Sequence, residues 1–263
     1  PIYDKPMIYY PLSTLMMAGI KDILIITTPQ DNSLFIDLLG DGSDLGINIK
    51  FQIQKNPTGL PDAFIIGEEF IGDSDVCLIL GDNIFHSDTF INKYLIPSFD
   101  KKTPTVFGYH VSDPERYGVV EFDEKLNVLS IEEKPLLPKS NYAVTGLYIF
   151  DNNAPSIARG LLPSARGETE IVDMLKYYLK HDALKVELLG RGVSWLDTGT
   201  HKSLHEVSSY IEVLENRQGL KIACLEEIAF QKGYISKEEL LILAGTMKNN
   251  EYGQYLIKVV NES

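Results

Sequence analysis

The chain has 263 residues, of which 44% are hydrophobic, and this composition is too rich in apolar side chains for a disordered protein. The net charge of −13 argues against a nucleic-acid-binding surface, because phosphate contacts need clustered lysine and arginine, whereas a mononucleotide site needs only a few local cations. Two distant cysteines without metal-ligand spacing, no membrane-length apolar run and no signal peptide lead us to expect a cytoplasmic protein that binds no membrane.

Helix-like and strand-like segments alternate in the first part of the chain. The expected helices cover residues 6–18, 34–39 and 63–70, and the expected strands cover residues 23–27, 48–54 and 76–80. Residues 76–80 form an apolar run without charge, which predicts a fully buried strand. Strands that alternate with helices of this length predict right-handed crossovers and a mainly parallel sheet.

The pattern changes twice farther along the chain. Strands are expected at residues 105–109, 143–150 and 184–189, and a hairpin is expected from residues 118–122 and 128–132. An antiparallel hairpin inserted in a parallel sheet is typical of a lid or a second binding surface. From residue 202 onward the apolar residues recur with helical period. The sequence therefore predicts an α/β core in residues 1–200 and a helical extension in residues 201–263.

Two aspartates follow apolar strand segments. Asp82 follows the run at 76–80, and Asp197 follows Trp195 and Leu196. Ligands of open α/β sheets bind beyond the carboxyl ends of strands, where two carboxylates can hold Mg²⁺ against nucleotide phosphates. Taken alone, each aspartate is as consistent with capping a turn or helix as with binding metal. The two together favour the metal site.

The expected hairpin ends in Glu132-Glu133-Lys134-Pro135. A carboxylate beside an ammonium can hold sugar hydroxyls with one group and phosphate with the other. Pro135 restricts the backbone and thereby the direction of Lys134. The alternative is a solvated charge cluster at a strand end, and the local sequence by itself favours that alternative.

Four other residues have side chains or backbone suited to a nucleotide sugar. The Gln54 amide matches the edge of a pyrimidine, and Gly59 would allow the backbone to approach a flat base. Gly118 begins a strand and could admit a sugar ring, and Arg166 lies on a loop before a helix, where a guanidinium could bind phosphate. For Gln54 and Gly59 the local sequence by itself favours an ordinary turn with a surface glutamine. For Gly118 and Arg166 a structural turn is the rival interpretation.

Five motifs occur in order along the whole chain. They are Tyr3-Asp4-Lys5-Pro6-Met7-Ile8-Tyr9-Tyr10-Pro11-Leu12, Leu80-Gly81-Asp82-Asn83, Glu115-Arg116-Tyr117-Gly118-Val119-Val120, Glu132-Glu133-Lys134-Pro135 and Trp195-Leu196-Asp197-Thr198-Gly199-Thr200. Their combination resembles the glucose-1-phosphate thymidylyltransferases of the sugar nucleotidyltransferase family. The resemblance implies a Rossmann-like core with a mixed, mainly parallel sheet, an inserted antiparallel hairpin and a C-terminal helical extension that assembles a homotetramer.

The resemblance also implies an activity and a set of site residues. The family transfers a thymidylyl group from dTTP to glucose 1-phosphate, releasing pyrophosphate and forming dTDP-glucose, which commonly feeds dTDP-rhamnose and polysaccharide synthesis. Position by position, the implied roles are Mg²⁺ ligands for Asp82 and Asp197, thymine contacts for Gln54 and Gly59, sugar contacts for Gly118, Glu133 and Tyr148, and phosphate contacts for Lys134 and Arg166. Asp82 also falls among the nucleotide-binding positions, and Asp82, Asp197, Lys134 and Arg166 are the expected catalytic residues.

The chain departs from the family pattern in two places. The sequence begins after the position of the family's first strand, glycine-rich phosphate loop and catalytic lysine, so the chain as written is expected to be inactive without that segment. Lys5 is a later lysine and does not inherit the catalytic role. In addition, Gly59-Leu60 continues into Pro61-Asp62 where the family has Ala-Gln.

Two alternative functions remain open at the level of sequence. A uridylyltransferase would share the core, and a pocket discriminates one methyl group by only about 1–3 kcal/mol. A non-catalytic sugar-nucleotide sensor would keep the pocket without the phosphate loop.

Overall fold

The computed structural model describes residues 1–165 and 167–262. Contacts divide the chain into two compact units, one formed by Pro1–Phe51 with Asp197–Ser263 and the other by Gln52–Leu196. We call the first the terminal unit and the second the central unit. The division into a catalytic core of residues 1–200 and an extension of residues 201–263 is a division of function and stays a prediction.

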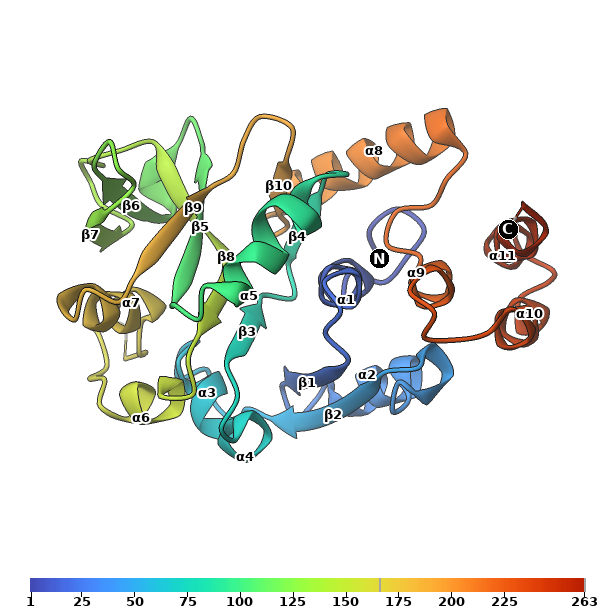
Figure 1. The fold of residues 1–263 in the computed structure, drawn as a ribbon, viewed down its shortest axis with the longest axis horizontal. Helices are drawn as coiled ribbons and strands as arrows, with labels where there is room; N and C mark the ends of the chain where they lie inside the picture. The colour runs from blue at the N-terminus through green and yellow to red at the C-terminus, as the bar shows by residue number, and fades with distance from the viewer. Residues whose placement is uncertain (166, 263) are drawn as a thin grey trace. The chain divides into compact units, whose positions relative to one another are not determined.

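The central unit contains most of the strands (Figure 1). Its strands are β3 (Val76–Ile79), β4 (Asn83–His86), β5 (Thr105–His110), β6 (Gly118–Phe122), β7 (Val128–Glu133), β8 (Tyr142–Phe150), β9 (Lys185–Leu188) and β10 (Ser194–Asp197, whose last residue belongs to the terminal unit). Its helices are α3 (Asp62–Ile66), α4 (Glu68–Ile71), α5 (Ile96–Asp100), α6 (Ala154–Arg159) and α7 (Ile171–Lys180). The helix expected at residues 63–70 is divided between α3 and α4 at Gly67.

A six-stranded mixed sheet forms the centre of this unit, in the order β7-β6-β8-β5-β9 with β3 also paired to β8. The inserted hairpin is present, because β6 and β7 pair antiparallel from Gly118↔Glu133 onward. The mixed α/β fold is therefore as expected, but the predominance of parallel pairs is not. Among the described strands of this sheet only β5 and β9 pair in parallel, whereas β8 runs antiparallel to β3, β5 and β6. Alternation along the chain predicts crossovers, but it does not determine beside which strand each crossover ends.

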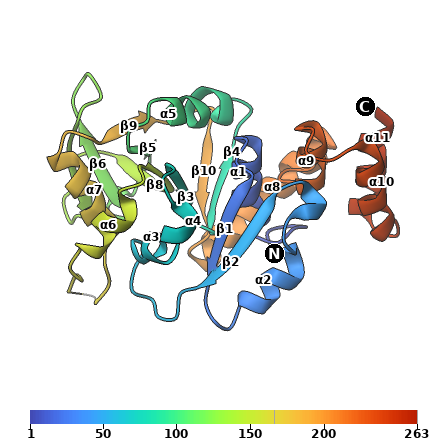
Figure 2. The same ribbon diagram turned by 60° about the horizontal axis from the view of Figure 1, so that its bottom comes forward.

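Helices α3, α6 and α7 cover one face of the sheet (Figures 1 and 2). Phe150 of β8 is 1% exposed and lies between the rings of Phe64 and Tyr178, with centroid distances of 5.2 and 5.4 Å. Aromatic pairs at these separations add to the free energy gained by burying the apolar surface. This contact packs α3 and α7 against the sheet that carries the candidate site residues.

Strand β3 is less buried than its sequence predicts. Each residue of Val76–Ile79 keeps part of its surface exposed. The strand pairs with β8 along one edge, and within residues 1–165 and 167–262 no strand pairs along its other edge. An apolar run therefore identified a strand correctly but did not determine the number of its neighbours.

The terminal unit is mainly helical. Its elements are α1 (Tyr9–Met17), β1 (Asp22–Thr27), α2 (Asn32–Leu39), β2 (Asn48–Ile53, ending in the central unit), α8 (His201–Gln218), α9 (Leu225–Gln231), α10 (Lys237–Thr246) and α11 (Glu251–Glu262). The helices expected after residue 200 are thus present. Thr200 caps α8 in a reciprocal capping box with Ser203, and Gly219 ends it in the left-handed region at φ 67°. No helix in the described part of the chain is long and apolar enough to cross a membrane.

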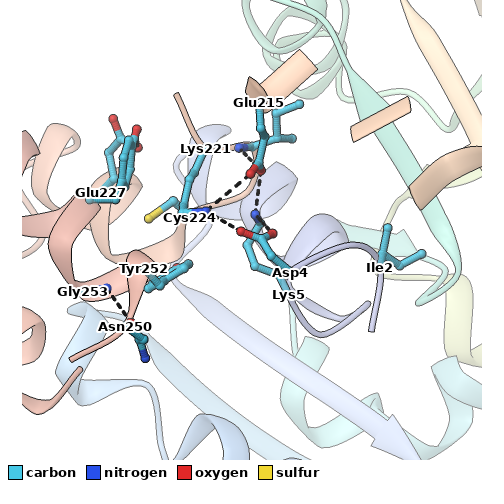
Figure 3. A network of polar contacts seen from close by, with 12 residues as sticks. Ile2, Asp4, Lys5, Glu215, Lys221, Cys224, Glu227, Asn250, Tyr252 and Gly253 are labelled. Carbon is cyan, nitrogen blue, oxygen red and sulfur yellow. Dashed lines mark hydrogen bonds and ion pairs between the residues drawn. The ribbon is translucent and has the colours of Figure 1, made fainter. Parts of the chain in front are cut away.

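A buried ion cluster connects the first residues of the chain to the end of α8 (Figure 3). The Lys5 side chain is 1% exposed, and its ammonium lies 2.6 Å from the Glu215 carboxylate and also contacts Asp4. Lys221 contacts the same two carboxylates, and the Ile222 backbone N–H donates to Glu215. Lys5 is therefore occupied by structural ion pairs, in agreement with its exclusion from the catalytic residues.

Candidate functional site

Asp82 lies in the turn between β3 and β4, at the carboxyl end of β3. Its side chain is half-buried, and its Oδ1 accepts a hydrogen bond of 2.8 Å from the Asn83 side-chain amide. The turn forms because the apolar run ends at Leu80 and Gly81, and the Asn83 backbone N–H donates back to the Leu80 carbonyl. The predicted position of this carboxylate at a strand end is therefore found in the structure.

Tyr148 is brought to Asp82 by the pairing of β3 with β8, in which Leu78 lies opposite Tyr148. The ring is 4% exposed. Burial raises the pKa of the Tyr148 hydroxyl, and the nearby carboxylates of Glu133 and Asp82 raise this pKa further. The hydroxyl consequently keeps its proton at neutral pH.

Glu133 lies at the end of β7, directly opposite Gly118 of β6. A Cβ atom at Gly118 would lie 3.5 Å from Glu133 Oε2 and 3.4 Å from Val172 Cγ2. The missing side chain thus leaves the backbone beside the carboxylate uncovered. Gly118 and Glu133 are thus adjacent in the central unit, and the Glu133 carboxylate is near enough to Tyr148 to raise the pKa of its hydroxyl. The sugar-binding role of these three residues stays a prediction.

Lys134 follows Glu133 in the left-handed region, with φ at 44°. Its backbone N–H donates to the Tyr117 carbonyl at 3.0 Å, and its ammonium lies 3.8 Å from Glu133 Oε1. Lys134 is 53% exposed in its side chain, so the ammonium reaches solvent next to the carboxylate. The predicted arrangement of an acid beside a cation is present, held by an unusual backbone conformation.

Gln54 and Gly59 belong to one loop between β2 and α3. The Gln54 amide donates to the Gly59 carbonyl at 3.1 Å and to the Asp62 carboxylate at 3.2 Å. Gly59 has φ at 115°, and a Cβ atom there would lie 2.0 Å from the Thr169 carbonyl oxygen. Glycine is therefore required at this position by close backbone approach within the protein itself.

Asp197 ends β10 in the terminal unit. Its Oδ1 accepts a hydrogen bond of 3.2 Å from the Gly199 backbone N–H. The cap of the following helix is Thr200 and not Asp197, whereas the bond from Gly199, two residues farther on, is the turn cap that the sequence allowed as the alternative to a metal ligand. Within the described residues, no group of three or more histidine, cysteine or acidic side chains is arranged to hold a metal ion. A metal at either aspartate would thus need ligands from a bound molecule as well.

Known proteins resemble this chain over nearly its whole length. Residues 1–213 match the nucleotidyl transferase family. The chain belongs to that family. A glucose-1-phosphate thymidylyltransferase from Neisseria meningitidis is 56% identical to this nucleotidyl transferase over 262 residues, covering 100% of this chain and 91% of that protein. A glucose-1-phosphate thymidylyltransferase from Mycobacterium tuberculosis is 49% identical over 266 residues, covering 100% of this chain and 91% of that protein.

Solved structures resemble this nucleotidyl transferase in fold. A Bacillus anthracis protein described as a candidate glucose-1-phosphate thymidylyltransferase, crystallised with sucrose, superposes with a TM-score of 0.73 at 36% identity, covering 80% of this chain and 84% of that chain. A UDP-glucose pyrophosphorylase bound to UDP-glucose superposes with a TM-score of 0.71 at 25% identity, covering 81% and 89%. The family and the enzyme class predicted from the motifs are thereby confirmed.

Two positions of this nucleotidyl transferase qualify the predictions. Arg166, an expected phosphate contact, lies outside the described residues. Asn83 received no role from the sequence, yet it is 4% exposed and hydrogen-bonded to Asp82, Gly146 and Trp195. Its position directly after Asp82 was the only available signal, because Gly146 and Trp195 are remote in sequence.

Proposed function

We propose that this protein transfers a thymidylyl group from dTTP to glucose 1-phosphate, forming dTDP-glucose and pyrophosphate. The observation that carries the proposal is the identity of 56% to a glucose-1-phosphate thymidylyltransferase over the full chain. The adjacency of Gly118 and Glu133 and the nearness of the Glu133 carboxylate to Tyr148 support it, because these are the three expected sugar-binding positions.

In this mechanism the sugar phosphate attacks directly. An oxygen of the glucose 1-phosphate phosphate group forms a bond to the α-phosphorus of dTTP, and the bond from that phosphorus to the pyrophosphate oxygen breaks. The attacking phosphate is already an anion, so no general base is needed and positioning supplies most of the rate. Tyr148 and Glu133 hold the sugar hydroxyls, and Lys134 binds phosphate. The family resemblance gives Arg166 the same phosphate-binding role.

The thymine base is assigned to the loop of Gln54 and Gly59. The Gln54 amide nitrogen already donates to Gly59 and Asp62, so its oxygen is the group that would meet the base. Gly59 fixes the loop through its close approach to Thr169.

Mg²⁺ is the proposed metal, with Asp82 and Asp197 as its protein ligands. Both are carboxylates at the ends of strands, and carboxylate oxygens are the donors that Mg²⁺ prefers. A magnesium site that uses one or two carboxylates and completes its coordination with substrate phosphates fits a chain whose described residues form no larger metal cluster. When bound, the ion would neutralise charge that develops on the phosphates.

A uridylyltransferase is the second candidate, and its support is the structural similarity to UDP-glucose pyrophosphorylase. The deciding experiment measures pyrophosphate release from glucose 1-phosphate and Mg²⁺ with dTTP, UTP, ATP or CTP. Fastest release with dTTP supports the proposal, and fastest release with UTP replaces it by the second candidate. If none of the four supports release, the same assay on a chain that carries the family's amino-terminal strand and phosphate loop separates the expected inactivity of the chain as written from a non-catalytic sensor. A Lys134→Ala variant should lose activity with the preferred nucleotide, whereas Lys125→Ala in the hairpin turn should not.

The proposal extends to assembly, location and product use. The resemblance assigns a homotetramer, which light scattering coupled to gel filtration tests directly. A cytoplasmic location agrees with Cys77 and Cys224 both being free thiols. The product dTDP-glucose would then supply dTDP-rhamnose for surface polysaccharide.

A further inference from the structure

Asp62 is the first residue of α3, and its carboxylate lies beside the loop that carries Gln54 and Gly59. Its Oδ2 accepts from the Gln54 side-chain amide at 3.2 Å and from the Thr58 hydroxyl at 2.7 Å. All four residues belong to the central unit. The sequence departs from the family pattern at Asp62, and the proposed function gives this carboxylate no role of its own.

The acceptors around Gln54 determine which way its carboxamide faces. The amide nitrogen donates to the Gly59 carbonyl at 3.1 Å as well as to Asp62. A carbonyl and a carboxylate can only accept, so an exchange of nitrogen and oxygen would set the Gln54 oxygen against two other acceptors. Hydrogen bonds to a charged group are the stronger kind, so Asp62 contributes more to this orientation than the Gly59 carbonyl does.

The Asp62 carboxylate is held in place from two sides. On the helix side, Phe64 is 2% exposed, and its ring meets that of Phe150 at a centroid distance of 5.2 Å. On the loop side, the Thr58 carbonyl accepts from the Thr169 backbone N–H at 2.8 Å and from the Thr169 hydroxyl at 3.0 Å. Asp62 therefore lies between a packed helix and a loop that is bonded to the segment before α7.

This orientation presents one kind of polar group to a base. The hydrogen bonds that the Gln54 side chain makes to the described residues all leave from its nitrogen, so its oxygen is the atom left for a base. Thymine and uracil carry a hydrogen on N3 and can donate it to that oxygen. Cytosine carries a lone pair on N3, so two acceptors would meet there. Leaving polar groups unpaired is a strong means by which a site rejects an analogue.

We propose that Asp62 selects the base by positioning Gln54: the carboxylate holds the amide nitrogen, so that the oxygen accepts from the N3–H of thymine or uracil, and cytosine is rejected. The inference rests on the proposed function for the placement of the base at this loop. It adds the residue that makes a glutamine, which by itself offers a donor and an acceptor side by side, present only its acceptor. Asp62 acts through Gln54 and touches no substrate.

The test compares the binding of dTTP and dCTP by isothermal titration calorimetry. The two nucleotides share their sugar and phosphates, so the ratio of their Kd values reports the base alone. Asp62→Ala frees the Gln54 nitrogen, and we expect the preference for dTTP over dCTP to fall about tenfold. Asp62→Asn keeps an oxygen that can accept from Gln54, so it should retain the preference. A merely structural role of Asp62 would weaken both nucleotides alike.

A second measurement needs no nucleotide. The Gln54 amide donates to two acceptors, so we expect exchange of its side-chain hydrogens with water, followed by heteronuclear nuclear magnetic resonance, to be faster in Asp62→Ala and unchanged in Asp62→Asn. The matched control is Asp123→Ala, because Asp123 also accepts from a side-chain amide, that of Asn127 at 2.9 Å, but lies in the hairpin turn. The control should change neither the Kd ratio nor the exchange at Gln54.

The outcomes separate this inference from the proposed function. Fastest turnover with UTP overturns the proposed function and leaves the inference standing, because uracil carries the same N3–H. An unchanged Kd ratio in Asp62→Ala, or unchanged exchange at Gln54, overturns the inference alone. If the unmodified protein binds neither dTTP nor dCTP, the assignment of the base to this loop fails, and the inference fails with it. Should Asp62→Ala not fold, Thr58→Val removes the hydroxyl that holds Asp62 Oδ2 and must lower the same ratio.

Discussion

The buried ion cluster of the terminal unit allows a quantitative prediction for Glu215→Gln. Glutamine keeps an oxygen that can accept from Lys5 and from the Ile222 N–H, so the substitution removes mainly the negative charge. Two ammonium groups, those of Lys5 and Lys221, then share the single carboxylate of Asp4 (Figure 3). The Lys5 side chain is 1% exposed and that of Glu215 is 6% exposed, so water cannot solvate the unbalanced charge.

Removing one partner of a buried ion pair costs about 3–5 kcal/mol. With a urea m-value of about 2–3 kcal/mol/M, the unfolding midpoint should fall by about 1–2.5 M. Lys5→Met should cost a similar amount, because it leaves the carboxylates with Lys221 alone. The double variant should lose less than the sum of the two, by about 0.5–3 kcal/mol, since it restores neutrality.

The assay is urea unfolding at pH 7, followed by far-ultraviolet circular dichroism. The control is Glu206→Gln, whose pair with Lys202 is also on α8 but has side chains 61% and 86% exposed at 3.7 Å. An exposed pair of this kind is worth about 0.3–0.5 kcal/mol. A loss for Glu215→Gln no larger than that of the control, or strict additivity in the double variant, would refute the argument.

Three further predictions concern other parts of the molecule. Gly59 has φ at 115°, and Gly59→Ala places a Cβ atom 2.0 Å from the Thr169 carbonyl oxygen. The substitution should lower the free energy of unfolding by about 1–3 kcal/mol, seen as a lower urea midpoint, and should raise the KM for dTTP. Burial, with a smaller contribution from Glu226, raises the pKa of the Cys224 thiol, so a disulfide reagent at pH 8 should label it only after unfolding. Burial alone would raise the pKa of the Asp4 carboxyl, but Lys221 and Lys5 hold this pKa below its ordinary value of 3.8. The ionised Asp4 carboxylate therefore stabilises the folded state above about pH 3.8, and this stabilisation is lost as the pH falls through the folded pKa.

Each of these predictions has a matched comparison. Gly245→Ala should not destabilise the protein, because a Cβ atom there would meet no described atom within 4 Å beyond its own helix backbone and chain neighbours. A Cys77→Ser background leaves Cys224 as the only thiol, and labelling of the native protein at the rate of a free thiol would contradict the burial argument. For the acid transition, a Lys5→Met variant should unfold at a higher pH than the unmodified protein, and an unchanged acid midpoint would contradict the assignment.

The candidate site was predictable to different degrees at different residues. Asp82 and Gly118 were placed at strand ends by an apolar run and a hairpin pattern, whereas Glu133 received its role from the resemblance to a family, because its local sequence favoured a solvated charge cluster. The roles of all three stay predictions. The sequence did not predict the number of neighbours of β3 or the direction of most strand pairs, because both depend on which remote strand lies alongside. Gly59 was expected to admit a base, and the structure adds that it admits the Thr169 carbonyl.

By itself the sequence determined the positions of most helices and strands and the family to which the chain belongs, because these depend on local periodicity and on motifs of consecutive residues. Only the tertiary structure decided that residues 1–51 pack with the helices after residue 196, that Lys5 is neutralised by Glu215, and that Asn83 links Asp82 to Trp195. The physical reason is that a buried charge or amide must find its partners wherever the folded chain brings them. Those partners lie up to 210 residues away along the chain.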